Sequence, residues 1–160
     1  MIRIICVGKI KEKYFVDALN EYKKRISKYS KLEIIEVSDE ATDNEKIVLN
    51  KEKERILKYI NKSDYNIVLD IDGTELSSVQ LSEKINNIFT NYNSNITFII
   101  GGSCGIDREI KNICDFRLSF SKMTFPHQLF RVILLEQIYR SFKLLNNESY
   151  HKWFVEYQYV

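Results

Sequence analysis

The segment SFSKMTFPHQ, residues 119–128, lies between a short apolar stretch and a long apolar one, and the expected fold follows from it. Pro126, the only proline of the chain, predicts the start of a helix that continues to about Asn146, because proline is tolerated in the first helical turn. The apolar residues at 116–120 predict a strand. Open α/β sheets bind ligands where a strand's carboxyl end meets a helix's amino end. The segment is therefore a candidate ligand loop, and the alternative is an ordinary connection whose apolar side chains fill the core.

Outward from this segment, short apolar runs alternate with stretches of helical periodicity. Strands are expected at residues 2–8, 32–37, 65–71, 95–100 and 116–120, and helices at 11–29, 43–61, from Ser77 or Ser78 to 92, 107–114 and 126–146. The pair Asp72-Gly73 predicts a turn that ends the third strand. The alternation predicts an α/β fold with a mainly parallel sheet covered by helices on both faces. The length of 160 residues, without a linker or repeat, predicts a single domain.

Apolar residues surround most of the circumference of the last predicted helix. They are Leu129, Phe130, Val132, Ile133, Leu134, Leu135, Ile138, Tyr139, Phe142, Leu144 and Leu145. A helix that is apolar on nearly all sides must be buried on nearly all sides. One face is therefore expected to cover the sheet and another to contact a second copy in a symmetric homodimer. The alternative is that the earlier helices bury both faces.

Charge and cysteine content narrow the class of protein. Residues 1–31 carry nine basic side chains against three acidic ones, and residues 32–95 carry seven against thirteen. This asymmetry permits a polyanionic partner, although a solvated helix face explains the basic residues 23–28 as well. The three cysteines have no metal-type spacing and the two histidines form no ligand pair, so we expect reduced thiols, a cytoplasmic location and no metal. No apolar run reaches the roughly 20 residues of a membrane span, so no membrane partner is expected.

A glycine-rich stretch, GGSCG at 101–105, follows the predicted strand at 95–100. Glycine lets a ligand approach the backbone closely, and the alternative is a tight turn with positive φ. No GxGxxG motif follows the first strand, and the GxxxxGK[ST] motif is absent. The candidate ligand loops at 101–105 and 120–126 follow consecutive strands. They form one crevice if those strands lie near one another in the sheet.

Three motifs resemble one known family. FIIGGSCGI at 98–106, LSFSKMTFPHQLFRVILLEQIYRSFKLL at 118–145 and YHK at 150–152 are similar to the ribosomal RNA large subunit methyltransferase H family. VGKIKEKYF at 7–15 and YKKRISKYSKLEIIEV at 22–37 also resemble it, so the likeness covers residues 1–152. These enzymes are SPOUT methyltransferases, which implies a single SPOUT domain over 1–160 with a C-terminal trefoil knot. Residues 153–160, WFVEYQYV, are then an extension beyond the family-like end.

The resemblance implies an S-adenosylmethionine-dependent enzyme that uses no metal and methylates N3 of a pseudouridine, at position 1915, in 23S rRNA. The expected partners are a second copy of the chain and the 50S subunit or 70S ribosome. The positions matching the family's cofactor site are Leu69, Gly101, Gly102, Phe120, Ser121, Lys122, Met123, Thr124 and Phe125. Their types suit an adenosine ligand, which needs apolar walls and backbone hydrogen bonds.

The tail carries the polar candidates that the resemblance implies. His151 is the expected catalytic residue, Tyr150 and Lys152 are expected to bind substrate, and the tail is expected to reach the pocket of the neighbouring subunit. Without the resemblance, His151 is a solvated terminal residue. The sequence departs from the family in its extension and at Cys104, where a small polar residue is common. The alternatives are another RNA methyltransferase of this fold, acting on tRNA, and a catalytically silent dimeric binding module.

Overall fold

The computed structural model describes residues 1–150 of the 160-residue chain. The elements follow in the order β1 (Ile2–Val7), α1 (Lys13–Ile26), β2 (Leu32–Val37), α2 (Glu45–Leu57), β3 (Tyr65–Glu75), α3 (Ser78–Asn91), β4 (Ile96–Ile100), α4 (Arg108–Ile113), β5 (Phe116–Ser119) and α5 (His127–Leu145). Each expected strand and helix is present in the expected order. The helices are shorter than expected by one to four residues at an end, which shows that apolar periodicity alone does not mark a helix end.

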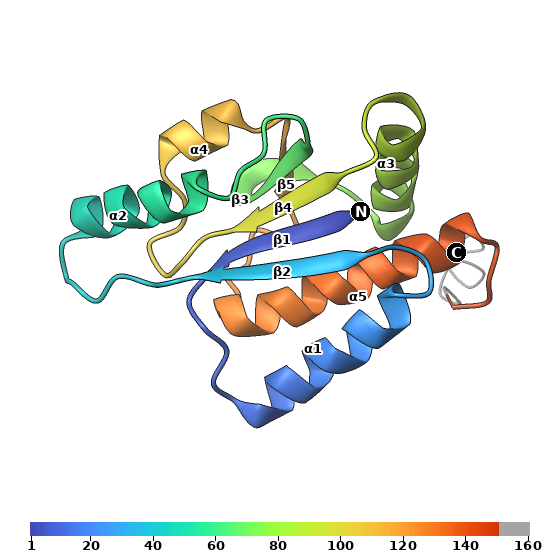
Figure 1. Cartoon of the computed structure of the whole chain (residues 1–160), viewed down its shortest axis with the longest axis horizontal. Helices are drawn as coiled ribbons and strands as arrows, with labels where there is room; N and C mark the ends of the chain where they lie inside the picture. The colour runs from blue at the N-terminus through green and yellow to red at the C-terminus, as the bar shows by residue number, and fades with distance from the viewer. Residues whose placement is uncertain (151–160) are drawn as a thin grey trace.

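The five strands form one sheet in the order β2-β1-β4-β3-β5, and each neighbouring pair is parallel (Figure 1). The expected parallel sheet is thus confirmed. All five residues of β4 are buried, as both faces of a parallel strand must be when helices cover the sheet. The two strands that precede the candidate ligand loops, β4 and β5, are not neighbours, because β3 lies between them.

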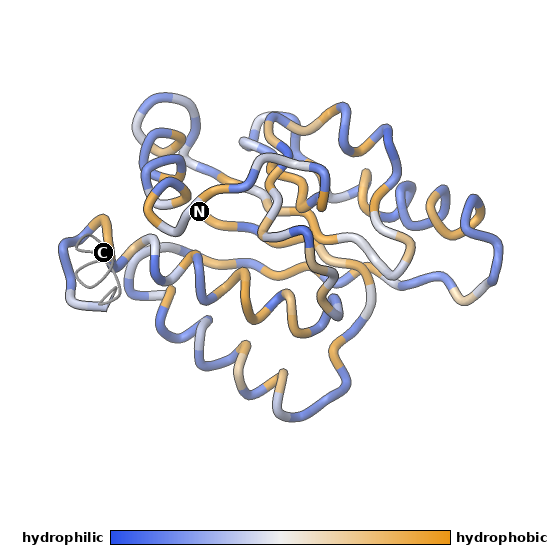
Figure 2. The backbone as a smooth tube through the Cα atoms, turned by 180° about the vertical axis from the view of Figure 1, so that it is seen from behind, coloured by the Kyte–Doolittle hydropathy of each residue, from blue (hydrophilic) through white to orange (hydrophobic). Residues whose placement is uncertain are grey.

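Helices cover both faces of the sheet, as expected. On one face α5 lies between α1 and α3, while α2 and α4 lie on the other (Figure 1). Alternate residues of β1 enter the two cores: Ile4 and Cys6 face the α1, α3 and α5 layer, and Ile5 and Val7 face the α2 and α4 layer. The backbone seen from behind shows apolar strands at the centre and polar stretches on the outer turns of the helices (Figure 2).

Neighbouring helices bury much of α5, so its apolar circumference does not by itself require a partner. Ile138 is fully buried and Phe142 is 7% exposed, both in the core that α5 shares with α1 and α3. The Phe142 ring stacks on Tyr29 at 5.5 Å and on Phe89 at 6.4 Å between ring centroids. For these side chains the alternative interpretation is correct. Leu129, near the amino end of α5, remains 36% exposed.

The expected end of the third strand at Ile71 is wrong, because β3 continues to Glu75. Its pairing with β5 is irregular: Leu69 and Thr74 both lie opposite Leu118, so the four intervening residues bulge out of the ladder. A Cβ atom at Gly73 would lie 2.7 Å from the Arg117 carbonyl oxygen, so the glycine permits the two backbones to approach. The Asp-Gly signal therefore marks a bulge at the carboxyl edge of the sheet.

Side-chain caps mark the start of α2, α3 and α4, and at α4 the Asp107 side chain accepts a hydrogen bond from the Glu109 N–H. The Asn44 side chain accepts a hydrogen bond from the Ile47 N–H at the start of α2. Ser77 and Gln80 form a capping box at the start of α3, which confirms the predicted start there. Among the described residues, no helix is long and apolar enough to cross a membrane.

Candidate functional site

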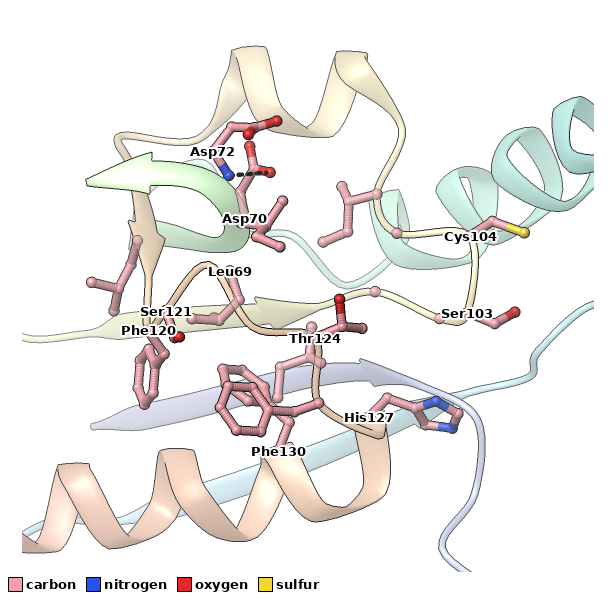
Figure 3. Close-up of a pocket in the computed structure, with 18 of the residues that line it drawn as sticks. Leu69, Asp70, Asp72, Ser103, Cys104, Phe120, Ser121, Thr124, His127 and Phe130 are labelled. Atoms are coloured by element: carbon pink, nitrogen blue, oxygen red, sulfur yellow. Dashed lines mark hydrogen bonds between the residues drawn. The ribbon is translucent and has the colours of Figure 1, made fainter. Parts of the chain in front are cut away.

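A pocket of about 380 Å³ lies at the carboxyl edge of the sheet, beyond the ends of β4 and β5 and beside the bulge in β3 (Figure 3). Its walls come from residues 69–72, 100–106 and 118–130, with Lys111 of α4 at one side. The volume is in the range of small-molecule sites, which is about 300–1,000 Å³. The two candidate ligand loops thus meet in one crevice, although β4 and β5 are separated by β3.

Most of the residues expected to hold the cofactor line this pocket. They are Leu69, Gly101, Gly102, Phe120, Ser121, Met123, Thr124 and Phe125. Lys122 is not among the lining residues: its side chain is 74% exposed and its Nζ lies 3.9 Å from Oε1 of Glu75. The structure therefore brings eight of the nine predicted positions together, while their role in binding a cofactor stays a prediction.

The glycine-rich stretch forms a tight turn whose shape depends on its glycines. The Gly105 N–H donates to the Gly102 carbonyl at 3.1 Å, and Gly105 has a φ of +80°. A Cβ atom at Gly101 would lie 2.3 Å from the Gly105 carbonyl oxygen. The two interpretations of this stretch are therefore compatible, since a positive-φ turn forms part of the pocket wall. A larger residue at Gly101 would displace the turn before it met any ligand.

Aromatic side chains form the apolar side of the pocket. Phe120 follows β5, Phe125 precedes α5 and Phe130 lies in the first turn of α5. The Phe130 ring lies 5.0 Å from Phe120 in an edge-on arrangement and 6.0 Å from Phe125 in a stacked one. Such contacts between aromatic rings hold all three in place, so the wall is built before any ligand binds.

Asp70 is the buried charge of the pocket, and the sequence interpretation missed it. Its side chain is 3% exposed and is paired with Lys111 at 3.0 Å and with Arg117 at 2.6 Å. Burial alone would raise the pKa of Asp70, but the hydrogen bonds from Lys111, Arg117 and the Asp72 N–H outweigh burial and lower it. Asp70 is therefore an ionised group with its partners in place, and it fixes α4 and β5 to the bulge in β3.

His127, the first residue of α5, also lines the pocket and was also missed. Burial and then the positive charge of Arg131 lower the pKa of His127. Arg131 is fully buried and donates from Nη2 to the carbonyls of Val7 at 2.5 Å and Gly8 at 2.6 Å, and from Nη1 to Glu36 at 2.8 Å. This guanidinium joins the amino-terminal half of α5 to the end of β1.

Of the tail residues, Tyr150 is described; it packs against α5 and is not among the residues that line the pocket. Its ring packs edge-on against Tyr139 at 5.0 Å and lies 4.8 Å from the Arg140 guanidinium. His151 and Lys152 lie outside the described residues, so their predicted roles stay predictions.

The three cysteines are free thiols. Burial raises the pKa of Cys6 to about 11 and of Cys114 to about 12, so both are neutral near pH 7. Cys104 lies in the pocket wall. Among residues 1–150, no group of three or more His, Cys, Asp or Glu side chains is placed to hold a metal ion.

Comparison with known proteins identifies the class to which this fold and pocket belong. A family model described as "Predicted SPOUT methyltransferase" matches residues 1–151, so the chain belongs to the SPOUT methyltransferase family. The resemblance noted from the motifs is confirmed within that class. A protein of Methanococcus maripaludis named "Putative ribosomal RNA large subunit methyltransferase H" is 61% identical over 157 residues, covering 94% of this chain and 99% of that protein.

Other relatives support the same placement. A protein of Acetivibrio thermocellus named "Ribosomal RNA large subunit methyltransferase H" is 54% identical, with the same coverage of 94% and 99%. Among solved structures, a probable methylase family protein from Haemophilus influenzae aligns with a TM-score of 0.57 at 15% identity. That alignment covers 94% of this chain and 70% of the other, and it shows a shared fold.

Proposed function

We propose that this protein is an S-adenosylmethionine-dependent enzyme that methylates N3 of a pseudouridine, at position 1915, in the 23S rRNA of assembled ribosomes. The observation that carries the proposal is the 61% identity to the Methanococcus protein over nearly the whole of both chains. The relatives' names support ribosomal RNA as the class of substrate. The choice of nucleoside rests on the family that the motifs at 98–106 and 118–145 resemble. A ribosomal substrate places the enzyme in the cytoplasm.

The pocket suits S-adenosylmethionine in size and in the chemistry of its walls. Its volume of about 380 Å³ is that of a small-molecule site. Phe120, Phe125 and Phe130 offer apolar faces against which an adenine ring can pack. Three of the five residues of the turn at 101–105 are glycines, and they offer backbone donors and acceptors without a side chain in the way. We propose the nine positions predicted from the sequence, Lys122 included, as the cofactor-binding set.

When bound, S-adenosylmethionine supplies an electrophilic methyl group together with its leaving group, so the transfer itself needs no metal. The chain's own residues then hold donor and acceptor in line, which contributes roughly 7–11 kcal/mol to lowering the barrier. N3 must also lose its proton, and a positioned base adds about 10²–10⁴-fold. We propose His151 for this proton and Tyr150 and Lys152 for binding the substrate.

The position of Tyr150 supports action as a homodimer. The 19 residues of α5 extend over about 28 Å. The pocket lies at the amino end of α5, while Tyr150 packs against Tyr139 and Arg140 in its carboxyl-terminal half. A residue at that end of α5 is distant from the pocket of its own chain, so it can contact only the pocket of a second copy. Near the pocket, Met123 is 72% exposed and Leu129 is 36% exposed, and both offer apolar surface to such a copy.

Transfer of a labelled methyl group from S-adenosylmethionine tests the proposal against the alternatives. We expect label in 50S subunits or 70S ribosomes that lack the modification, and none in tRNA. Label in tRNA would indicate another RNA methyltransferase of this fold. Absence of both transfer and cofactor binding, measured by calorimetry, would indicate a catalytically silent binding module.

A further inference from the structure

Glu52, on the third turn of α2, is a buried carboxylate that the proposed chemistry does not use. Its relative exposure is 3%. Oε1 accepts a hydrogen bond from the Glu40 N–H at 3.2 Å, but Oε2 has no partner among the described residues. Leaving a buried charged oxygen unpaired is costly, because the desolvation of that oxygen is not compensated. The position of Oε2 therefore calls for a functional explanation.

The unpaired oxygen faces the glycine turn of the pocket. A Cβ atom at Gly102 would lie 2.8 Å from Oε2 and 3.1 Å from Oε1 of Glu52. Gly102 lines the pocket, whereas Glu52 does not. The carboxylate thus lies behind the turn, and a side chain at position 102 would have to displace it.

We propose that Glu52 is a positioning residue for the cofactor loop, whose Oε2 accepts a hydrogen bond from a backbone N–H of residues 102–104 when the ligand binds. The bond fixes the turn in the shape that contacts the ligand. The inference rests on the proposed function, because S-adenosylmethionine is the ligand. Glu52 does not touch the ligand and acts through the turn.

The surroundings of Glu52 disfavour its ionised form, as expected for a carboxylate whose Oε2 has no hydrogen-bond donor among the described residues. Burial raises the pKa of Glu52 despite the hydrogen bond from the Glu40 N–H. The carboxylates of Asp39 and Glu40 in the β2–α2 loop raise it further, while Arg55 of α2 opposes them. A second N–H donor would favour the ionised form. The proposed hydrogen bond would therefore compensate the unpaired Oε2 when the ligand binds.

Replacement of Glu52 by glutamine separates the two oxygens. In Glu52→Gln the amide oxygen can still accept from the Glu40 N–H, while the NH₂ group that replaces Oε2 cannot accept from the turn. We expect about a tenfold weaker affinity for S-adenosylmethionine in calorimetry, with an unchanged or higher unfolding midpoint in the absence of ligand. Glu54→Gln, the same change at an exposed position of α2, should leave the affinity unchanged.

Wild-type affinity in Glu52→Gln would overturn the inference, and so would a loss of stability in proportion to the loss of affinity. A second measurement needs no variant: the pKa of Glu52, followed through its carboxyl ¹³C resonance, should fall when S-adenosylmethionine is added to the wild type. An unchanged pKa would also overturn the inference. Failure of the wild type to bind S-adenosylmethionine would instead overturn the proposed function, and this inference with it.

Discussion

His127 makes the stability of this protein depend on pH. Its folded-state pKa lies below its ordinary value because burial and the neighbouring Arg131 disfavour the protonated ring. The stability that this preference contributes is present above the unfolded pKa of about 6.5 and is lost as the pH falls through the folded value. We expect the free energy of unfolding in urea to fall less between pH 7 and pH 5 in His127→Gln than in the wild type. Equal slopes would show that His127 contributes nothing.

Arg131 is the side chain whose loss should destabilise the fold most. It is 1% exposed and donates to two backbone carbonyls and to Glu36. In Arg131→Met these acceptors lose their donor, which should cost roughly 3 kcal/mol in chemical denaturation. Arg131→Lys should recover only part of that, because an ammonium cannot reproduce the fork of the guanidinium. A cost below about 1 kcal/mol for Arg131→Met would contradict this role.

At the scale of single residues, the sequence predicted the loops of the pocket better than its polar groups. Glycines and aromatics next to strand ends indicate a ligand loop, and eight of the nine predicted positions line the pocket. Lys122 was included because its position matches the cofactor site of the family that the motifs resemble, but its side chain is 74% exposed. Asp70 and His127 were missed because the burial of a polar side chain depends on tertiary contacts with residues distant in sequence, such as Arg117 for Asp70.

At the scale of elements, the central strands β1 and β4 were predictable because most of their residues are buried and apolar, and their bounds differ from the predicted ones by one residue. The edge strand β2 has the predicted bounds. The end of β3 was not predictable, because pairing with β5 overrides the local Asp-Gly turn signal. The sequence predicted that one apolar face of α5 covers the sheet and that another contacts a second copy of the chain. It does not show that α1 and α3 both pack against α5.

The amino end of α5 is where we expect a second copy to bind. Ile138 and Phe142 belong to the core of the single chain, so changes there would test folding rather than assembly. Leu129→Asp alters an exposed side chain and should shift the sedimentation coefficient in analytical ultracentrifugation from dimer to monomer.

Circular dichroism of Leu129→Asp should stay unchanged. As a matched control, Ile47→Asp changes an exposed apolar residue of α2 and should leave the dimer intact. A wild-type protein that sediments as a monomer at micromolar concentration would contradict the homodimer.

At the scale of the whole molecule, the alternation of strands and helices predicted a parallel sheet with helices on both faces, and the motifs predicted the family. Both are confirmed. The strand order was not predictable, since periodicity does not report which strands are neighbours. That order explains the site, because placing β3 between β4 and β5 brings the bulge at residues 70–73 between the two ligand loops.

Mass mapping of ribosomal RNA is the sharpest test of the proposal that this chain methylates one nucleoside of 23S rRNA. Ribosomes that lack the modification are incubated with the protein and isotopically labelled S-adenosylmethionine, and the 23S rRNA is digested and sequenced by mass. We expect one added methyl group, on N3 of the pseudouridine at position 1915. A methyl group on any other nucleoside, or unmodified rRNA in the presence of a protein that binds the cofactor, would contradict it.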